Sequence, residues 1–295
     1  MRLYGNYRRL YAILVLFTAL LVEVPAYAGQ DLPRPDHIVI VIEENHSFKQ
    51  IIGSPAAPYL NQLAAQGALL TNYYGVTHPS QPNYLALFAG LMDTGIENKC
   101  PLTINIPNMR SALAQVGRTF TGYAEDLPAV GATDCILVAY ARKHVPWVNW
   151  QESQINQVPP AENRPMTDFP SDFDRLPTVS IVVPNQRNDM HDGSDPQRIK
   201  DGDAWLQAHL EPYVQWAFSH NSLLIVTWDE DDGDHRSPNQ IPTILVGPMV
   251  QPGRYEEKAN HYSLLRTILD MYGAQPIGLS RQASPIRSPW KPVSP

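Results

Sequence analysis

Three short apolar runs in the sequence end abruptly in polar clusters, and this pattern limits the folds open to the chain. The runs are residues 37–42 (HIVIVI), 178–183 (TVSIVV) and 222–228 (SLLIVTW). Apolar, β-branched runs of this length without an alternating polar face are typical of strands buried on both faces of a sheet. The sequence therefore predicts a sheet with a fully covered centre.

Segments with helical patterning lie between the apolar runs. We expect helices at 58–66, 82–89, 108–116, 203–218 and 261–272, and further strands at 68–74, 119–123 and 241–246. Alternation of strands and helices predicts an α/β fold with a mostly parallel central sheet and helices on both faces. Residues 124–176 are rich in proline and polar residues, and we expect long loops and a small insertion there.

The N-terminus has the pattern of a secretory signal peptide. A basic start is followed by an apolar stretch at residues 10–22 and by the small-residue site Ala26-Tyr27-Ala28. An uncleaved anchor is the alternative, although a membrane span needs about 20 apolar residues. We predict a signal peptide at 1–28, a single catalytic domain at 29–295, and no transmembrane span after cleavage. Such a signal specifies export, either to a periplasm or out of the cell.

Charge and cysteine content narrow the function further. The net charge is −7, and removing three Arg and one Glu with the leader from 22 basic and 29 acidic residues makes it about −9. Nucleic-acid binding normally requires a basic surface, so we expect no nucleic-acid partner. An anionic substrate would need a metal ion or backbone N–H groups to bind. Cys100 and Cys135 are expected to form a disulfide in an oxidising compartment.

The polar clusters that follow the strands are the candidate site. In parallel sheets, ligands bind outside the carboxyl ends of the strands. Crowded carboxylates repel one another unless a cation neutralises them, so we expect a divalent metal ion at this edge. Its identity (Ca, Mg, Mn or Zn) stays open. The oxygen ligands expected for the ion are Glu44, Asn45, Asp229 and Glu230, together with Ser80.

Ser80 is the candidate nucleophile. It precedes a predicted helix that Pro82 helps to start, so the helix dipole and free N–H groups would favour an alkoxide and a phosphate. The alternatives are that Ser80 is only an N-cap, or that Thr77 is the nucleophile. Asn83 and His78 are expected to contact the substrate; the alternatives for His78 are that it orients the loop that carries Ser80 or is only structural.

Two more histidines stand where chemistry is expected. His191 lies between Asp189 and Asp192, which would orient it or share a second metal with it, and it is the candidate general acid. His261 opens a predicted helix and is a candidate ligand. The remaining histidines carry no comparable signal: His37, His144, His209, His220 and His235.

Several longer stretches point to a known family. Residues 43–48 (EENHSF), 77–84 (THPSQPNY) and 228–233 (WDEDDG), with 124–131, 141–149 and 188–193, resemble the phosphoesterase branch of the alkaline phosphatase superfamily. That branch contains secreted acid phosphatases and bacterial phospholipases C. The resemblance implies an alkaline-phosphatase-like fold, a metal-assisted Ser80 nucleophile, and ligation by Glu44, Asn45, Asp229 and Glu230. Classical superfamily members have Asp-His where this chain has Asp229-Glu230, so we expect one ion to suffice in place of the usual two zinc ions.

The sequence leads to one main functional hypothesis and two alternatives. The resemblance implies an acid phosphatase that hydrolyses phosphate monoesters through a phosphoserine on Ser80, and it makes phosphatidylinositol 3-phosphate the specific candidate substrate. A phospholipase C-type phosphodiesterase on the same scaffold is the first alternative. A secreted binding protein without activity is the second.

Overall fold

The computed structural model of the protein describes residues 32–92, 95–233 and 238–292. The predicted signal peptide at 1–28 lies outside the described residues. From Leu32 onward, the described residues belong to one compact unit. In this part of the chain, none of the helices is long and apolar enough to cross a bilayer.

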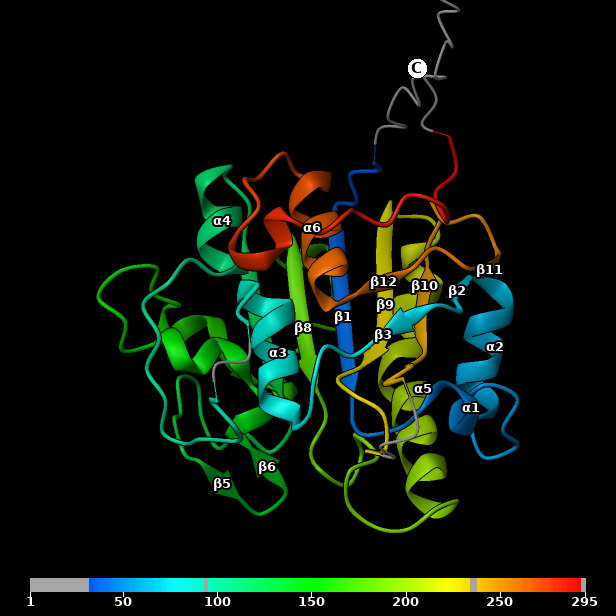
Figure 1. The fold of residues 1–295 in the computed structure, drawn as a ribbon, viewed down its shortest axis with the longest axis horizontal. Coiled ribbons are helices and arrows are strands. Elements are labelled where there is room, and N and C mark those ends of the chain that lie inside the picture. The colour runs from blue at the N-terminus through cyan, green and yellow to red at the C-terminus, as the bar shows by residue number, and fades with distance from the viewer. Residues whose placement is uncertain (1–31, 93–94, 234–237, 293–295) are drawn as a thin grey trace, which may run out of the picture. The chain divides into compact units, whose positions relative to one another are not determined.

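An eight-stranded sheet forms the centre of this unit (Figure 1). β10 runs antiparallel to both of its neighbours, and every other adjacent pair is parallel. The mostly parallel sheet confirms the predicted fold class. In order across the sheet, the strands are β11 (Gly253–Tyr255), β2 (Ala68–Leu70), β10 (Thr243–Val246), β9 (Ser222–Trp228), β1 (His37–Glu43), β8 (Val179–Val183), β4 (Phe120–Ala124) and β7 (Asn163–Pro165).

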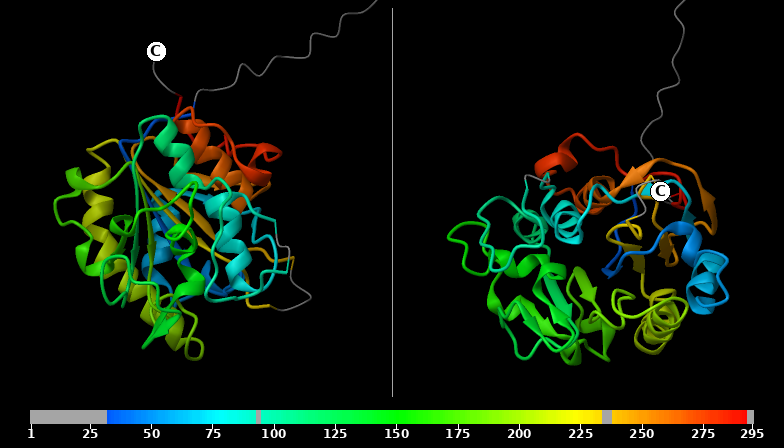
Figure 2. Two further views of the ribbon diagram at one scale, coloured as in Figure 1. Left: turned by 90° about the vertical axis from the view of Figure 1, so that its left-hand side faces the viewer. Right: turned by 60° about the horizontal axis from the view of Figure 1, so that its bottom comes forward.

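Helices cover both faces of the sheet (Figure 2). On one face, α3 (Ser80–Ala89) and α4 (Met109–Gln115) both contact α6 (His261–Met271). The 21-residue α5 (Gln197–Ala217) covers the other face and contacts α2 (Pro58–Gln66), which follows the short α1 (Phe48–Ile51). Two-sided coverage explains why β1, β8 and β9 are almost wholly apolar and buried along their lengths.

Three predicted elements differ from the structure. The strand expected at 68–74 is two strands, because β3 (Tyr73–Tyr74) leaves the main sheet and pairs with β12 (Ala259–Asn260). Helix α3 begins at Ser80 rather than at Pro82. Helix α5 begins six residues before the predicted start, in a stretch whose single apolar residue, Ile199, gives no apolar periodicity.

The insertion predicted at 124–176 is a set of short elements fixed to the sheet. It contains a hairpin of β5 (Ile136–Leu137) and β6 (Tyr140–Ala141), together with β7 and five 3₁₀ turns. The turns are η1 (Arg142–His144), η2 (Pro146–Trp150), η3 (Pro160–Glu162), η4 (Met166–Asp168) and η5 (Phe173–Arg175). The predicted Cys100–Cys135 disulfide is present and ties the hairpin to the segment after α3.

One close contact holds this insertion against the edge of the sheet. The buried ring of Trp147 lies directly over Gly122 in β4, and a Cβ atom on Gly122 would overlap that ring. The indole Nε1 also donates to Asn163 Oδ1 at 2.7 Å. Trp147 is three residues after His144, the last residue of η1, so this contact also positions His144.

We expect Gly122→Ala to lower the free energy of unfolding by about 1–3 kcal/mol, because the new methyl group must displace a close-packed indole. Chemical denaturation would measure this loss. Thr121→Ala in the same strand is the matched control. It should lower the free energy of unfolding by less, since Thr121 is only half-buried. Equal stability of Gly122→Ala and the wild type would contradict the proposed packing role.

Candidate active site

Ser80 is the first residue of α3, and its side chain is 2% exposed. Pro79 occupies the N-cap, so Ser80 is not the capping residue. Its Oγ lies 3.1 Å from Glu44 Oε2 and 3.2 Å from Glu230 Oε1. A hydroxyl has one proton and can donate to only one of two carboxylates at a time. The second oxygen therefore needs either a proton of its own or a cation.

The pairing of β1 with β9 brings the acidic residues together. Glu43 lies opposite Trp228 in the parallel register, so the residues that follow both strands meet. The Asn45 backbone N–H donates to Asp229 Oδ1 at 3.2 Å, and its side-chain amide donates to Glu230 Oε1 at 3.1 Å. Glu44 and Glu230 thus contact the Ser80 hydroxyl, and Asn45 links Asp229 to Glu230, so the four residues predicted as ligands meet at one place.

Electrostatics at this point favour a bound cation. Burial, followed by the neighbouring negative charges, raises the pKa of Glu44 and of Asp229 well above the usual range. Among the described residues, Asn45 Oδ1 and Asp229 Oδ2 are buried without a hydrogen-bond partner. Oxygen atoms that lack donors but would suit a hard cation are what a divalent-ion site requires. The donor set therefore fits a metal ion.

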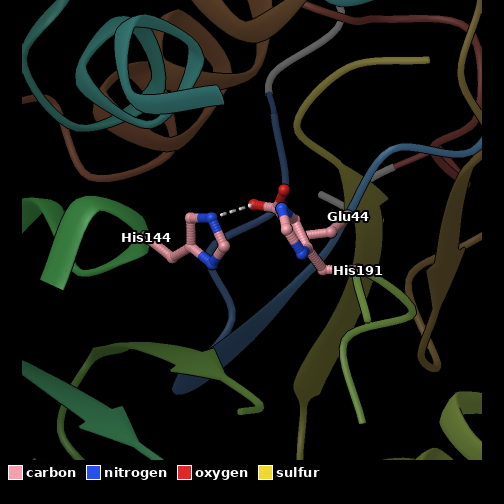
Figure 3. A group of neighbouring side chains, drawn as sticks. All are labelled: Glu44, His144 and His191. Carbon is pink, nitrogen blue, oxygen red and sulfur yellow. Dashed lines mark ion pairs between the residues drawn. The ribbon is translucent and has the colours of Figure 1, made fainter. Parts of the chain in front are cut away.

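His144 belongs to the same centre, although no metal-ligand or catalytic role was predicted for it. Its Nε2 lies 3.1 Å from Glu44 Oε1, and its Nδ1 lies 3.3 Å from Asp189 Oδ2. Burial lowers the pKa of His144, so the ring is neutral at ordinary pH. Ligand atoms of Glu44, His144 and His191 lie within 4.8 Å of one another and form a group that can hold a metal ion (Figure 3).

The segment after β8 supplies His191, Asp189 and Asp192. Asp189 is buried, and its Oδ1 accepts from the His191 backbone N–H at 2.8 Å. Burial raises the pKa of Asp189 well above its usual value. The exposed Asp192 carboxylate lies 2.8 Å from His191 Nδ1, which orients the half-exposed ring. His191 is thus a partly solvated imidazole beside a buried carboxylate group.

His78 and Asn83 both contact Glu230. His78 Nδ1 lies 2.8 Å from Glu230 Oε2, and hydrogen bonding to this carboxylate raises the pKa of His78. The Asn83 amide donates to the same oxygen at 3.2 Å and also to the Thr77 carbonyl at 2.8 Å. Asn83 therefore shapes the loop before Ser80. The Thr77 hydroxyl, the rival nucleophile, donates to the His78 carbonyl.

His261 differs from the ligand role expected for it, because both of its ring nitrogens contact protein groups. Nε2 lies 2.6 Å from the Asp229 carbonyl oxygen, and Nδ1 lies 3.2 Å from the Tyr73 hydroxyl. A carbonyl can only accept, so Nε2 carries the proton and Nδ1 accepts from Tyr73. Burial lowers the pKa of His261 to about 4. The neutral ring supports the Asp229 backbone.

This buried ring should make stability depend on pH. The unfolded chain binds a proton near the ordinary pKa of 6.5, whereas the folded chain does not until about pH 4. The contribution of the neutral ring to the free energy of unfolding is therefore complete above pH 6.5, and it falls by about 3 kcal/mol as the pH drops to 4. Chemical denaturation in the presence of a chelator, repeated across this pH range, should show a smaller loss of stability in His261→Gln than in the wild type. Parallel pH profiles would contradict this.

Three contributing residues were missed from the sequence. The Tyr84 hydroxyl donates to Glu44 Oε1 from the first turns of α3, and its ring stacks on His144. Buried His46 contacts the Glu44 carbonyl at 2.8 Å and Asp195 Oδ1 at 3.1 Å. All three residues lie in stretches that suggested the family: His46 in 43–48, Tyr84 in 77–84 and His144 in 141–149. His144 lies in the insertion, where no predicted strand marked the place.

Sequence comparisons agree on the kind of protein that this chain resembles. Residues 54–275 match the profile of the Phosphoesterase family. A phosphatidylinositol-3-phosphatase of Mycobacterium tuberculosis is 48% identical over 293 residues, which cover 96% of this chain and 94% of that protein. A phosphate-repressible acid phosphatase of Penicillium chrysogenum is 32% identical over 262 residues, which cover 82% of this chain and 60% of the fungal protein.

Solved structures show the same fold at low sequence identity. A protein of the alkaline phosphatase superfamily from Vibrio parahaemolyticus aligns with a TM-score of 0.61 at 14% identity, covering 83% of this chain and 68% of that one. The lipoteichoic acid synthase LtaP of Listeria monocytogenes aligns with a TM-score of 0.58 at 9% identity, covering 84% of this chain and 74% of that one. These matches confirm the alkaline-phosphatase-like fold.

Proposed function

The chain belongs to the Phosphoesterase family, and from that premise we propose that it is an exported acid phosphatase that hydrolyses phosphate monoesters through Ser80. The buried Ser80 hydroxyl between Glu44 and Glu230 is the observation that carries this proposal. The relative from Mycobacterium tuberculosis makes phosphatidylinositol 3-phosphate the specific candidate substrate.

Ser80 acts as the nucleophile in this proposal. A carboxylate among its neighbours accepts the hydroxyl proton as the Oγ–P bond forms and the bond to the leaving alcohol breaks. The phosphoryl group is then held on Ser80 at the start of α3, where the helix dipole favours negative charge. Water later attacks phosphorus on the opposite side, and the proton returns to Ser80.

Two side chains assist these steps. His191 is half-exposed and oriented by Asp192, so it can protonate the leaving alkoxide and later take a proton from water. His78 contacts Glu230 and is 40% exposed at the site, where the raised pKa favours a cation that attracts the phosphate. Asn83 fixes the backbone of the nucleophile loop.

We propose that one divalent ion is held by Glu44, Asn45, Asp229, Glu230 and Ser80. The unpartnered oxygens of Asn45 and Asp229 support this set. When bound, the ion would lower the pKa of the Ser80 hydroxyl and polarise a phosphoryl oxygen. Glu44 also belongs to the group with His144 and His191, which offers imidazole nitrogens and would better suit zinc.

Export through a cleaved leader at 1–28 is part of the same proposal. The disulfide supports it, because disulfides persist in oxidising compartments outside the cytoplasm. The substrate would then be met in a periplasm or outside the cell.

Ser80→Ala should lower kcat by about a thousandfold or more, since loss of the nucleophile removes the covalent route. Hydrolysis of p-nitrophenyl phosphate measures this, and bis(p-nitrophenyl) phosphate tests for a phosphodiesterase. Thr77→Ala is the matched control and should keep most of the activity. Near-normal kcat in Ser80→Ala with a loss in Thr77→Ala would transfer the role to Thr77.

Removal of metal by a chelator should abolish turnover, and added ion should raise the melting temperature of the protein. Asp229→Asn should weaken the binding of the ion by about tenfold or more, yet stabilise the chelated protein by relieving repulsion. His144→Gln should change binding much less. Ion affinity should fall at lower pH, because the raised pKa values of Glu44 and Asp229 let protons compete.

The comparison of these two variants locates the ion. A large loss of affinity in His144→Gln, with little change in Asp229→Asn, would place the ion in the histidine group instead. Calorimetric titration of each variant with Mg, Ca, Mn and Zn salts would show which donor set binds and which ion it prefers.

A further inference from the structure

The β5–β6 hairpin presents an apolar tip to solvent. Strand pairing of Leu137 with Tyr140 leaves a two-residue loop of Val138 and Ala139. Ile136 is 72% exposed, Leu137 is 39% exposed and Val138 is 82% exposed. Within the described residues, Val138 and Ile136 are the two most exposed large apolar side chains. Three consecutive apolar side chains therefore stand outside the core.

Val138 adopts a backbone conformation that is unfavourable for its type. Its φ is +55°, in the left-handed region that two-residue hairpin loops require and that glycine or asparagine normally supplies. A β-branched residue at positive φ is an outlier that costs free energy. Because the side chain is exposed, packing within this chain does not offset that cost. The folded chain alone thus gives no reason for valine here.

The base of the hairpin is held firmly. The Cys100–Cys135 disulfide lies directly before β5, and the Arg142 backbone N–H donates to the Cys135 carbonyl at 2.9 Å. The buried Arg142 guanidinium donates to the carbonyls of Thr133 and Leu102 at 2.8 and 3.0 Å. Because the base is fixed, the hairpin can keep its conformation when its tip contacts another surface.

The hairpin adjoins the candidate active site. Strand β6 runs directly into η1, which carries His144. The Ala139 carbonyl accepts from Gln186 N–H at 2.9 Å, and the Gln186 carbonyl accepts from Asp192 N–H at 2.6 Å. Asp192 in turn contacts His191. Figure 1 shows β5 and β6 at the edge of the molecule where β1 and β8 end.

We infer that Ile136, Leu137 and Val138 insert into the interfacial layer of a lipid bilayer and hold the active-site edge at the membrane surface. This inference rests on the proposed function, because the phosphate of a phosphoinositide lies at that surface. A convex apolar tip suits a fluid bilayer interface, into which apolar side chains sink by roughly 5–10 Å. The net charge of −7 makes attraction to anionic lipids a poor alternative source of binding.

The test compares a membrane substrate with a soluble one. Vesicles of phosphatidylcholine containing phosphatidylinositol 3-phosphate serve as the first, and p-nitrophenyl phosphate as the second. Ile136→Ser/Val138→Ser should lower vesicle turnover and vesicle co-sedimentation by about tenfold or more, because the loss of even one inserted apolar side chain reduces partitioning by about that factor. Turnover of the soluble ester should not change.

Two further variants sharpen the comparison. Val138→Gly should stabilise the hairpin, since glycine accepts positive φ, and should still reduce vesicle turnover. Phe218→Ser is the matched control. Phe218 is 43% exposed but lies between α5 and β9, where β9 begins, at the opposite end of the strands from the hairpin. This control should leave vesicle turnover unchanged. Co-sedimentation of the wild type should persist at high salt, as expected for apolar insertion.

The outcomes separate this inference from the proposed function. Wild-type vesicle turnover in the double variant would overturn membrane docking while leaving the phosphatase assignment intact, and so would loss of co-sedimentation in salt. Equal losses on both substrates would show that the hairpin acts only through the site, which also overturns docking. No turnover of either substrate by the wild type would contradict the proposed function. Co-sedimentation of the wild type and the double variant with vesicles would then be the test of membrane docking.

Discussion

The convergence of carboxylates where β1 and β9 end is the constraint on which the rest of the site depends. Parallel pairing of these strands puts Glu44 and Asp229 side by side in a place closed to water. Each carboxylate raises the cost of ionising the other, and burial adds to that cost. The hydroxyl of Ser80, the amides of Asn45 and Asn83 and the phenol of Tyr84 all donate into this cluster. Their positions follow from the need to balance negative charge.

Histidines around this cluster differ in how readily they take up a proton. His78 lies at the surface against Glu230, and its pKa is raised. His144 and His261 are buried, and desolvation lowers the pKa of each despite the acidic groups nearby. His191 is partly exposed, and Asp192 fixes its orientation. Burial, rather than proximity to carboxylates alone, therefore decides which imidazole is charged in the metal-free protein.

Much of this architecture could be predicted from the sequence, because parallel strands carry a strong local signal. A buried strand must be apolar, so the polar residues that follow it mark the active edge of the sheet, and Glu44, Asn45, Asp229 and Glu230 were placed in this way. Ser80 was found for the same reason, although the helix begins at Ser80 itself rather than at Pro82. Those parts of the site are local in sequence.

The parts that escaped prediction depend on contacts between distant segments. His144 reaches Glu44 from an insertion that Trp147 packs against Gly122 of β4, and no periodicity encodes that contact. His261 was expected to be a ligand because it opens a helix after a strand, whereas Tyr73 and the Asp229 carbonyl occupy both ring nitrogens. Side-chain orientation of this kind is a tertiary property that spacing alone does not determine.

The unpartnered oxygens of the site have a consequence for how such a chain can evolve. Neutral replacements of similar shape at Glu44 or Asp229 would relieve repulsion and desolvation, so the wild-type residues are not the most stable choice for the metal-free fold. Selection for stability alone would remove them. Their presence therefore records selection for chemistry, and the apolar sheet beneath them supplies the surplus stability that lets the chain tolerate an unfavourable set of side chains at its working edge.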